Sequence, residues 1–275
     1  MSVMADATLD TAIEAPLVYS VRTDVKPVSA TGGKDGLMRS TVGTFAKHVM
    51  RIEDGRRRVS DFRLDDAGFE LADHPTEVRD FFDPDELRGV YYPEMERLIA
   101  ERTGASRVFV FDHTLRSSDE DERAERKIRE PVQRVHNDYT EWSGPQRVRD
   151  FFPDEAEALI ARRFAIVQVW RAINRPIERN PLALADARSI AFADLIPAER
   201  RFPDRVGEIY MVEHNPAHRW TYFPRLRRDE AIVFKVYDSD AHRARWTAHT
   251  SFEDPTTPAG APPRESIEIR AFAFF

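Results

Sequence analysis

The amino-acid sequence predicts a mainly β protein with flanking helices (α+β), built as a double-stranded β-helix, or jelly roll. Several short runs of β-branched and aromatic residues follow one another in the second half of the chain without intervening helices. Turn-forming residues separate these runs, and no internal repeat is visible. The length of 275 residues is within the range that single all-β sandwiches and barrels reach. We therefore expect a single domain over residues 1–275, with its core over about 105–275.

The N-terminal segment has weaker patterns. Residues 1–35 mix short apolar pieces with glycines and are expected to form an irregular arm or an edge strand. Residues 58–64 and 68–71 have the composition of two short strands.

The next region has the periodicity of a helix. Between residues 84 and 103, apolar side chains recur at helical spacing, with Pro84 at the start and Gly104 just past the end. Pro93 lies inside this run. A proline is tolerated in the first turn of a helix but not in its interior. We therefore expect either a kink at Pro93 or a second helix that begins there.

Strands and short helices alternate in the middle of the chain. Residues 107–111 are predicted to form a buried strand, whereas residues 117–130 are charged without an apolar face and are expected to form an exposed loop. Residues 131–139 carry candidate metal ligands. A short helix is predicted over residues 153–161, followed by an alternating strand over 164–173.

The remaining sequence is rich in strands and turns, and its aromatic C-terminal end is expected to pack in the core. A proline-rich stretch near the end is interpreted as a loop inside the domain, because the strand after it carries candidate site residues. The predicted strands are residues 182–189, 207–212, 220–223, 231–237, 246–252 and 266–275.

Composition excludes several classes of protein. A formal net charge of −7 argues against general attraction to nucleic acid or to an anionic membrane. The absence of cysteine excludes disulfides, thiolate nucleophiles and iron–sulfur clusters. No apolar stretch reaches the roughly 18 residues of a membrane span, and the first residues lack the pattern of a secretory signal. We expect a cytoplasmic protein without membrane or nucleic-acid partners.

Two histidines and one aspartate are the candidate metal ligands. His136 and Asp138 are two residues apart in an extended segment, so their side chains point to the same side. His249 lies in another strand-like segment, and two distant strands of a jelly roll can meet at one site. Two imidazoles and a carboxylate bind iron(II) on one face and leave the opposite positions open. Rival third ligands in turn-like, charged surroundings are His214, His218 and His242.

Several polar and aromatic residues are candidates for binding small molecules. Arg264 and Ser266 share a side of the last strand with Arg270, so either arginine could hold a carboxylate through two hydrogen bonds. His113 and Arg116 follow the predicted buried strand. We expect the substrate to carry a carboxylate, bound by arginines near the pocket. The other candidates for substrate binding are Gln168 and Trp170 on one strand face, with Arg171 on the opposite face, and Arg188.

The sequence resembles the cephalosporin 7α-methoxylase-like hydroxylase/desaturase family of natural-product biosynthesis. The resemblance covers most of the chain from about residue 105 onward, and one departure is Gln168, where asparagine is expected. The matching segments are residues 110–116, 134–139, 169–189, 220–224, 230–239, 249–255 and 262–268.

The resemblance implies an iron(II)- and 2-oxoglutarate-dependent oxygenase that hydroxylates, desaturates or oxidatively cyclises a small substrate, with O₂ as the second co-substrate. It places the metal ligands on His136, Asp138 and His249. The residues alone leave two alternatives open. One is a metal-dependent, cupin-like or hydrolytic enzyme that has the same three ligands and does not use 2-oxoglutarate. The other is a non-catalytic jelly-roll binding protein. Neither the sequence nor the resemblance identifies the substrate or the oligomeric state.

Overall fold

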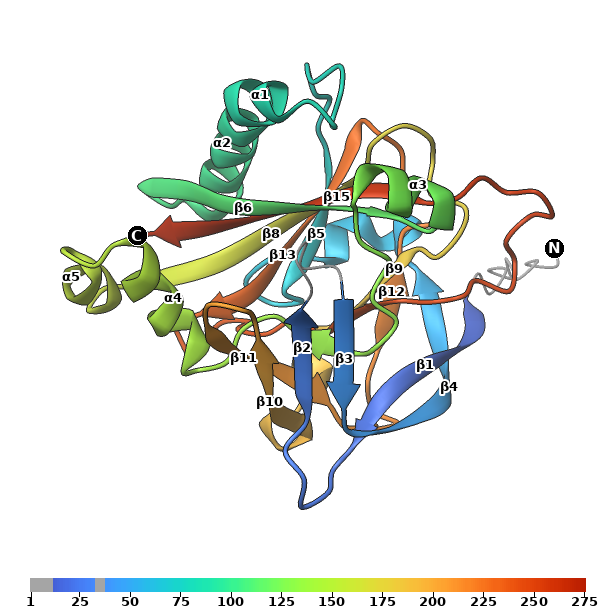
Figure 1. Cartoon of the computed structure of the whole chain (residues 1–275), viewed down its shortest axis with the longest axis horizontal. Helices are drawn as coiled ribbons and strands as arrows, with labels where there is room; N and C mark the ends of the chain where they lie inside the picture. Colours follow the sequence, from blue (N-terminus) through green and yellow to red (C-terminus); the bar gives the residue numbers. More distant parts are fainter. Residues whose placement is uncertain (1–11, 33–37) are drawn as a thin grey trace, which may run out of the picture.

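Two β-sheets pack face to face in the computed structural model, which describes residues 12–32 and 38–275 (Figure 1). The larger sheet contains, in spatial order, β1 (Ile13–Val21), β4 (Thr44–Asp54), β12 (Trp220–Tyr222), β9 (Leu182–Ala185), β14 (His249–Ser251), β7 (His136–Asn137), β11 (Val206–Val212), β10 (Leu195–Arg201), β2 (Val28–Gly32) and β3 (Met38–Val42). The smaller sheet contains β5 (Phe69–Asp73), β13 (Glu230–Asp238), β8 (Phe164–Ala172), β15 (Glu265–Phe274) and β6 (Arg107–Ser117). Most neighbouring strands are distant in sequence, as in a jelly roll, so the predicted fold class is confirmed.

The central strands of the smaller sheet are buried on both faces. In β8, Phe164 and Ile166 pack between the two sheets, whereas Val167 and Val169 pack on the opposite face. This is the alternation that a period of two residues produces in a strand. Phe272 of β15 is fully buried between the sheets, which confirms the expected core position of the C-terminal end.

A helical layer covers the outer face of the smaller sheet (Figure 1). It consists of α1 (Pro84–Glu86), a π-helical turn (Leu87–Tyr91) and α2 (Tyr92–Thr103). Pro93 lies in the first turn of α2, and Gly104 ends the helix at a positive φ of 72°, as the sequence predicted. The buried side chains of α2 join the apolar cluster that includes Val167 and Val169.

Two expectations for local structure were wrong, and one was confirmed in part. Residues 1–35 were expected to form an irregular arm or an edge strand, and the described part contains β1, which is an edge strand of the larger sheet, and β2; residues 1–11 and 33–35 lie outside the described residues. A 3₁₀ helix (Gly55–Asp61) replaces the strand expected from residue 58, because the side chain of Asp54 caps its N-terminus.

The charged loop expected over residues 117–130 contains α3 (Glu120–Arg126). Asp119 accepts a hydrogen bond from the amide of Glu122, acidic residues occupy the first turn, and arginines occupy the last turn. Capping and the helix dipole therefore form this helix without an apolar face. The patterns also missed α4 (Ser143–Phe151), whereas the helix predicted over 153–161 corresponds to α5 (Ala156–Ile160).

Within the described residues, every helix is too short or too polar to cross a lipid bilayer.

Candidate functional site

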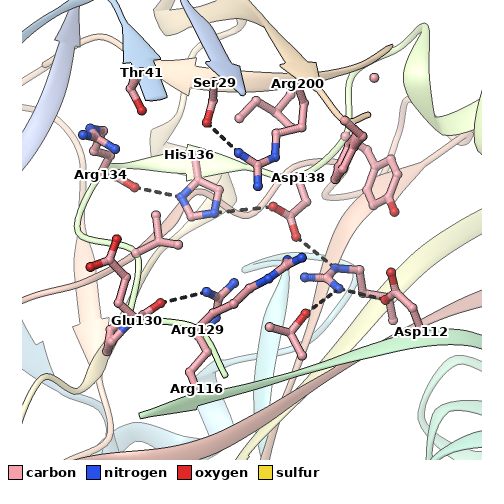
Figure 2. Close-up of a pocket in the computed structure, with 18 of the residues that line it drawn as sticks. Ser29, Thr41, Asp112, Arg116, Arg129, Glu130, Arg134, His136, Asp138 and Arg200 are labelled. Atoms are coloured by element: carbon pink, nitrogen blue, oxygen red, sulfur yellow. Dashed lines mark hydrogen bonds and ion pairs between the residues drawn. The ribbon is translucent and has the colours of Figure 1, made fainter. Parts of the chain in front are cut away.

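The predicted metal ligands converge on one point of the larger sheet, and Figure 2 shows two of them, His136 and Asp138. His136 of β7 and His249 of β14 are direct partners in the antiparallel pairing of these strands, and their ring centroids are 4.4 Å apart. Asp138 follows β7 by one residue and turns its carboxylate toward His136. The three candidate ligand atoms all lie within 4.8 Å of one another. Long-range strand register therefore brings together two residues that are more than a hundred positions apart in sequence.

Hydrogen bonds to the backbone orient both imidazoles. Nδ1 of His136 donates to the carbonyl of Arg134 at 2.7 Å, and Nδ1 of His249 donates to the carbonyl of Thr247 at 3.0 Å. A carbonyl can only accept, so Nδ1 carries the proton and Nε2 offers its lone pair. Nε2 of His136 lies 3.4 Å from Oδ1 of Asp138. Two imidazole nitrogens and one carboxylate oxygen fit a first-row divalent metal such as iron(II).

The electrostatic environment favours the metal-binding forms of His249 and Asp138. Burial, reinforced by the nearby His136, lowers the pKa of His249 to about 4, so its imidazole is neutral at physiological pH. Burial acts to raise the pKa of Asp138, but the adjacent His136 and the charge of Arg270 hold that pKa well below its usual value. A neutral histidine and an ionised aspartate are the forms that bind a metal.

The second carboxylate oxygen of Asp138 is held by two side chains. Nε2 of Gln168 donates to Oδ2 at 2.5 Å, and Nε of Arg270 donates to the same oxygen at 3.3 Å. Oδ1 is thereby turned toward His136. Gln168, a predicted substrate-binding residue, lines neither cavity described below and instead contacts this carboxylate.

Arg270 is surrounded by acceptors. Besides Asp138, its guanidinium contacts Asp112 at 2.8 Å, Thr114 at 3.2 Å and the buried carboxylate of Glu268. Burial opposes its charge, but the carboxylates raise the pKa of Arg270 well above its usual value. This arginine, one of the two candidates for holding 2-oxoglutarate, is already paired with carboxylates of the chain itself.

A small cavity extends from the two histidines to Arg264. It is also lined by Trp170, Ser251 and Arg116. Arg264 is only 3% exposed and lies 4.7 Å from the ring centroid of Trp170. Its Nε donates to Ser266 Oγ at 3.0 Å.

Arg264 forms no ion pair with a carboxylate among the described residues. Burial, with a smaller effect of Arg116, lowers the pKa of Arg264 to about 9. Glu268 lines the same cavity but is not paired with Arg264. A buried guanidinium that lacks a direct ion pair, fixed by a serine beside the metal ligands, is suited to bind a carboxylate.

A second, much larger cavity of about 1000 Å³ also adjoins the metal ligands. His136 and Asp138 form part of its wall, as do His113, Arg116 and Arg270. Nδ1 of His113 lies 2.7 Å from the hydroxyl of Tyr92. The volume of this large cavity is sufficient for a drug-sized ligand.

Two arginines suggested for the substrate pocket lie elsewhere. Arg171 is fully buried and contacts His74 and the carbonyl of Arg228, on the strand face opposite Gln168. The alternation of β8 predicted this orientation, and Arg171 lines neither of the two cavities. Arg188 is half exposed and paired with Asp186.

The rival histidines are engaged in other interactions. His218 is paired with Asp194 and lies against Tyr19, and His214 stacks on His48 with ring centroids 3.7 Å apart. His242 is exposed. Among the described residues, the cluster with metal-binding geometry is that of His136, Asp138 and His249.

Arg129 and Arg200 also line the large cavity, and the sequence patterns missed both. Arg129 belongs to the stretch that was expected to be an exposed loop, and Arg200 to a strand, β10, that was not predicted. No signal in a single sequence places either residue at the site.

The chain is similar to oxygenases of natural-product biosynthesis. A family model described as "Oxidoreductase/YMDC permease-like domain" matches residues 17–274. The chain is 34% identical over 234 residues to "Alpha-ketoglutarate-dependent dioxygenase phiK" of a fungal species, with 82% of this chain and 83% of that protein covered. It is 32% identical to "Hydroxylase/desaturase CTB9" of Cercospora beticola, with 89% and 81% covered. The solved structure of the "iron and alpha-ketoglutarate-dependent endoperoxidase NvfI" superimposes with a TM-score of 0.84 at 26% identity, over 96% of this chain and 98% of that one.

Proposed function

The chain belongs to the family of iron(II)- and 2-oxoglutarate-dependent hydroxylase/desaturases, and from this premise we propose that His136, Asp138 and His249 hold its iron. The enzyme is a dioxygenase of natural-product biosynthesis that uses iron(II), 2-oxoglutarate and O₂ on a small-molecule substrate. Family membership decides against the two alternatives that the residues left open. A bound iron(II) would use O₂ to convert 2-oxoglutarate to succinate and CO₂, with one oxygen atom going into succinate and the other supplying the oxidant that removes hydrogen from the substrate.

The observation that carries the ligand assignment is the convergence of three oriented donor atoms. Both Nδ1 atoms are engaged by backbone carbonyls, so both Nε2 atoms are available, and Oδ1 of Asp138 faces them. Gln168 and Arg270 act as positioning residues, because they occupy the other carboxylate oxygen and keep Asp138 in a one-oxygen binding mode.

We assign the 2-oxoglutarate site to the small cavity. Arg264 is proposed to bind the distal carboxylate, and Ser266 to orient the guanidinium. This assignment is supported by the lack of an acidic partner for Arg264, whereas Arg270 is saturated by carboxylates. The buried walls of this cavity exclude water from the co-substrate and strengthen its ion pair with Arg264.

The large cavity is the proposed substrate site. A carboxylate-bearing substrate is supported by Arg116, whose guanidinium is buried and, among the described residues, donates to one acceptor, the carbonyl of Glu130. Each cavity is lined by residues from both sheets. This shared lining supports the proposal that the described residues form one catalytic domain. A cytoplasmic location stays a prediction.

Anaerobic reconstitution tests the ligand assignment. The purified chain with iron(II) and 2-oxoglutarate is expected to develop the weak visible charge-transfer band of the chelate, and then to form succinate on admission of O₂. His136→Ala and Asp138→Ala should abolish both signals, whereas His242→Ala, at an exposed histidine, should leave them unchanged. Retention of the band and of turnover in either ligand variant would overturn the assignment.

A further inference from the structure

The wall of the large cavity has an unusual charge for this protein. Nine arginine and lysine side chains line it, against five aspartates and glutamates, although the whole chain has a net charge of −7. Part of this positive charge is neutralised, because Arg270 and Arg147 form ion pairs with acidic residues. The excess of positive charge in the cavity wall therefore comes from the other basic side chains.

Three of these arginines surround the metal ligands: Arg116, Arg129 and Arg200. Figure 2 shows all three extending toward the space beside His136 and Asp138. They come from separate parts of the chain, since Arg116 lies on β6, Arg129 follows α3, and Arg200 lies on β10. None of the three forms an ion pair with a carboxylate among the described residues.

The protein partners of these guanidiniums are few and neutral. Arg116 donates to the carbonyl of Glu130 at 2.9 Å, and Arg200 donates to Ser29 Oγ at 2.6 Å. Burial lowers the pKa of Arg116 and of Arg129, and burial together with the charge of Arg129 lowers the pKa of Arg200 to about 10. Gathering these like charges is therefore unfavourable in the free protein. The carboxylates of Glu268, Asp112 and Asp138 partly offset this repulsion, and Asp138 would itself be neutralised by a bound metal.

The co-substrate does not account for these charges. Arg116 lines both cavities, but Arg129 and Arg200 line only the large one. The distal carboxylate of 2-oxoglutarate is assigned to Arg264 in the small cavity. Arg129 and Arg200 are therefore available to a different anion, on the side of the metal site that the substrate occupies.

We propose that Arg129 and Arg200, together with Arg116, bind a cluster of oxyanions on the substrate, so that the substrate carries at least two negative charges close to the carbon that is oxidised. This inference rests on the proposed function and makes the substrate class more specific. Vicinal carboxylates and a phosphate ester share this chemistry. Three guanidiniums can provide several charge-assisted hydrogen bonds to either one, whereas a neutral substrate would leave all three guanidiniums without a direct ion pair.

The test uses anion probes on the enzyme reconstituted anaerobically with iron(II) and saturating 2-oxoglutarate. Tricarballylate represents clustered carboxylates, glucose 6-phosphate represents a phosphate ester, and butyrate is the single-charge control. Calorimetry measures binding at increasing salt, while the visible band reports whether 2-oxoglutarate stays bound. The variants are Arg129→Gln, Arg200→Gln and the double variant, with Arg162→Gln at an exposed arginine outside both cavities as the matched control.

At least one of the two polyanions is expected to bind about tenfold or more tightly than butyrate, with an affinity that falls as salt rises. The double variant should lose about 30-fold or more of that affinity and keep the visible band, whereas Arg162→Gln should bind as the wild type does. The stronger probe then distinguishes carboxylates from phosphate.

Equal binding of the probe to the double variant, displacement of the visible band by the probe, or no preference over butyrate would each overturn the inference. Failure of the wild type to form the band at all would instead contradict the proposed function.

Discussion

Arg264→Gln offers a quantitative test of how 2-oxoglutarate is held. In the structure, Nε of Arg264 donates to Ser266, and Nη1 donates to the carbonyl of Asn180 and to Ser251. The N–H groups on Nη2 have no protein acceptor among the described residues and are free for a carboxylate. A hydrogen bond involving a charged group contributes about 1.5–3 kcal/mol, so losing two of them costs roughly 3–4 kcal/mol if glutamine retains part of the contact.

Since about 1.4 kcal/mol corresponds to a factor of ten, the dissociation constant of 2-oxoglutarate should rise about 100- to 1000-fold. This dissociation constant is measured by titrating the visible band with 2-oxoglutarate under anaerobic conditions. Arg264→Lys keeps the charge but not the planar fork and should be intermediate. The thermal midpoint without ligands should not fall, because the substitution removes a buried charge that lacks a counter-ion.

Arg270→Gln is the control that separates the two candidate arginines. Arg270 holds Asp138, so its replacement should weaken metal binding more than 2-oxoglutarate binding measured at saturating metal. A loss of less than about tenfold in Arg264→Gln, with a large loss of 2-oxoglutarate affinity in Arg270→Gln, would refute the assignment of the clamp.

Three other substitutions test the positioning network and the core. Gln168→Leu removes the 2.5 Å hydrogen bond to Asp138 and should weaken iron(II) affinity about 10- to 100-fold in a chelator competition, and unchanged affinity would contradict the positioning role. Phe272→Ala empties a fully buried site between the sheets and should cost about 3–5 kcal/mol in denaturant unfolding, with a loss below about 1 kcal/mol arguing against that packing. Gly68→Ala should destabilise by at least about 1 kcal/mol, because Gly68 has a φ of +88° and an added Cβ would lie 2.3 Å from Thr247 Oγ1; an unchanged midpoint would contradict this geometry.

Local patterns in the sequence predicted much of the smaller sheet. Period-two alternation in β8 places Trp170 and Gln168 on one face and Arg171 on the other, as the structure has them. Helical spacing with Pro93 and Gly104 gave both ends of α2. These features depend on residues a few positions apart, so a single sequence contains them.

Other features depend on partners that are distant in sequence. The pairing of His136 with His249 is a matter of strand register, which the sequence suggested only through residue types and family resemblance. Arg129 reaches the metal site because its backbone pairs with β6, and Arg200 because it lies on β10, and no local apolar pattern reveals either placement. The cationic wall of the large cavity is therefore a property of the fold. The composition, with a net charge of −7, gave no indication of a positively charged cavity.

The most direct measurement is anomalous diffraction at the iron absorption edge from crystals grown anaerobically with iron(II) and 2-oxoglutarate. We expect one strong peak at about 2.0–2.2 Å from Nε2 of His136, Nε2 of His249 and Oδ1 of Asp138, with 2-oxoglutarate extending from it toward Arg264. A peak at another site, or a fully loaded crystal in which any of these three side chains points away from the iron, would contradict the account.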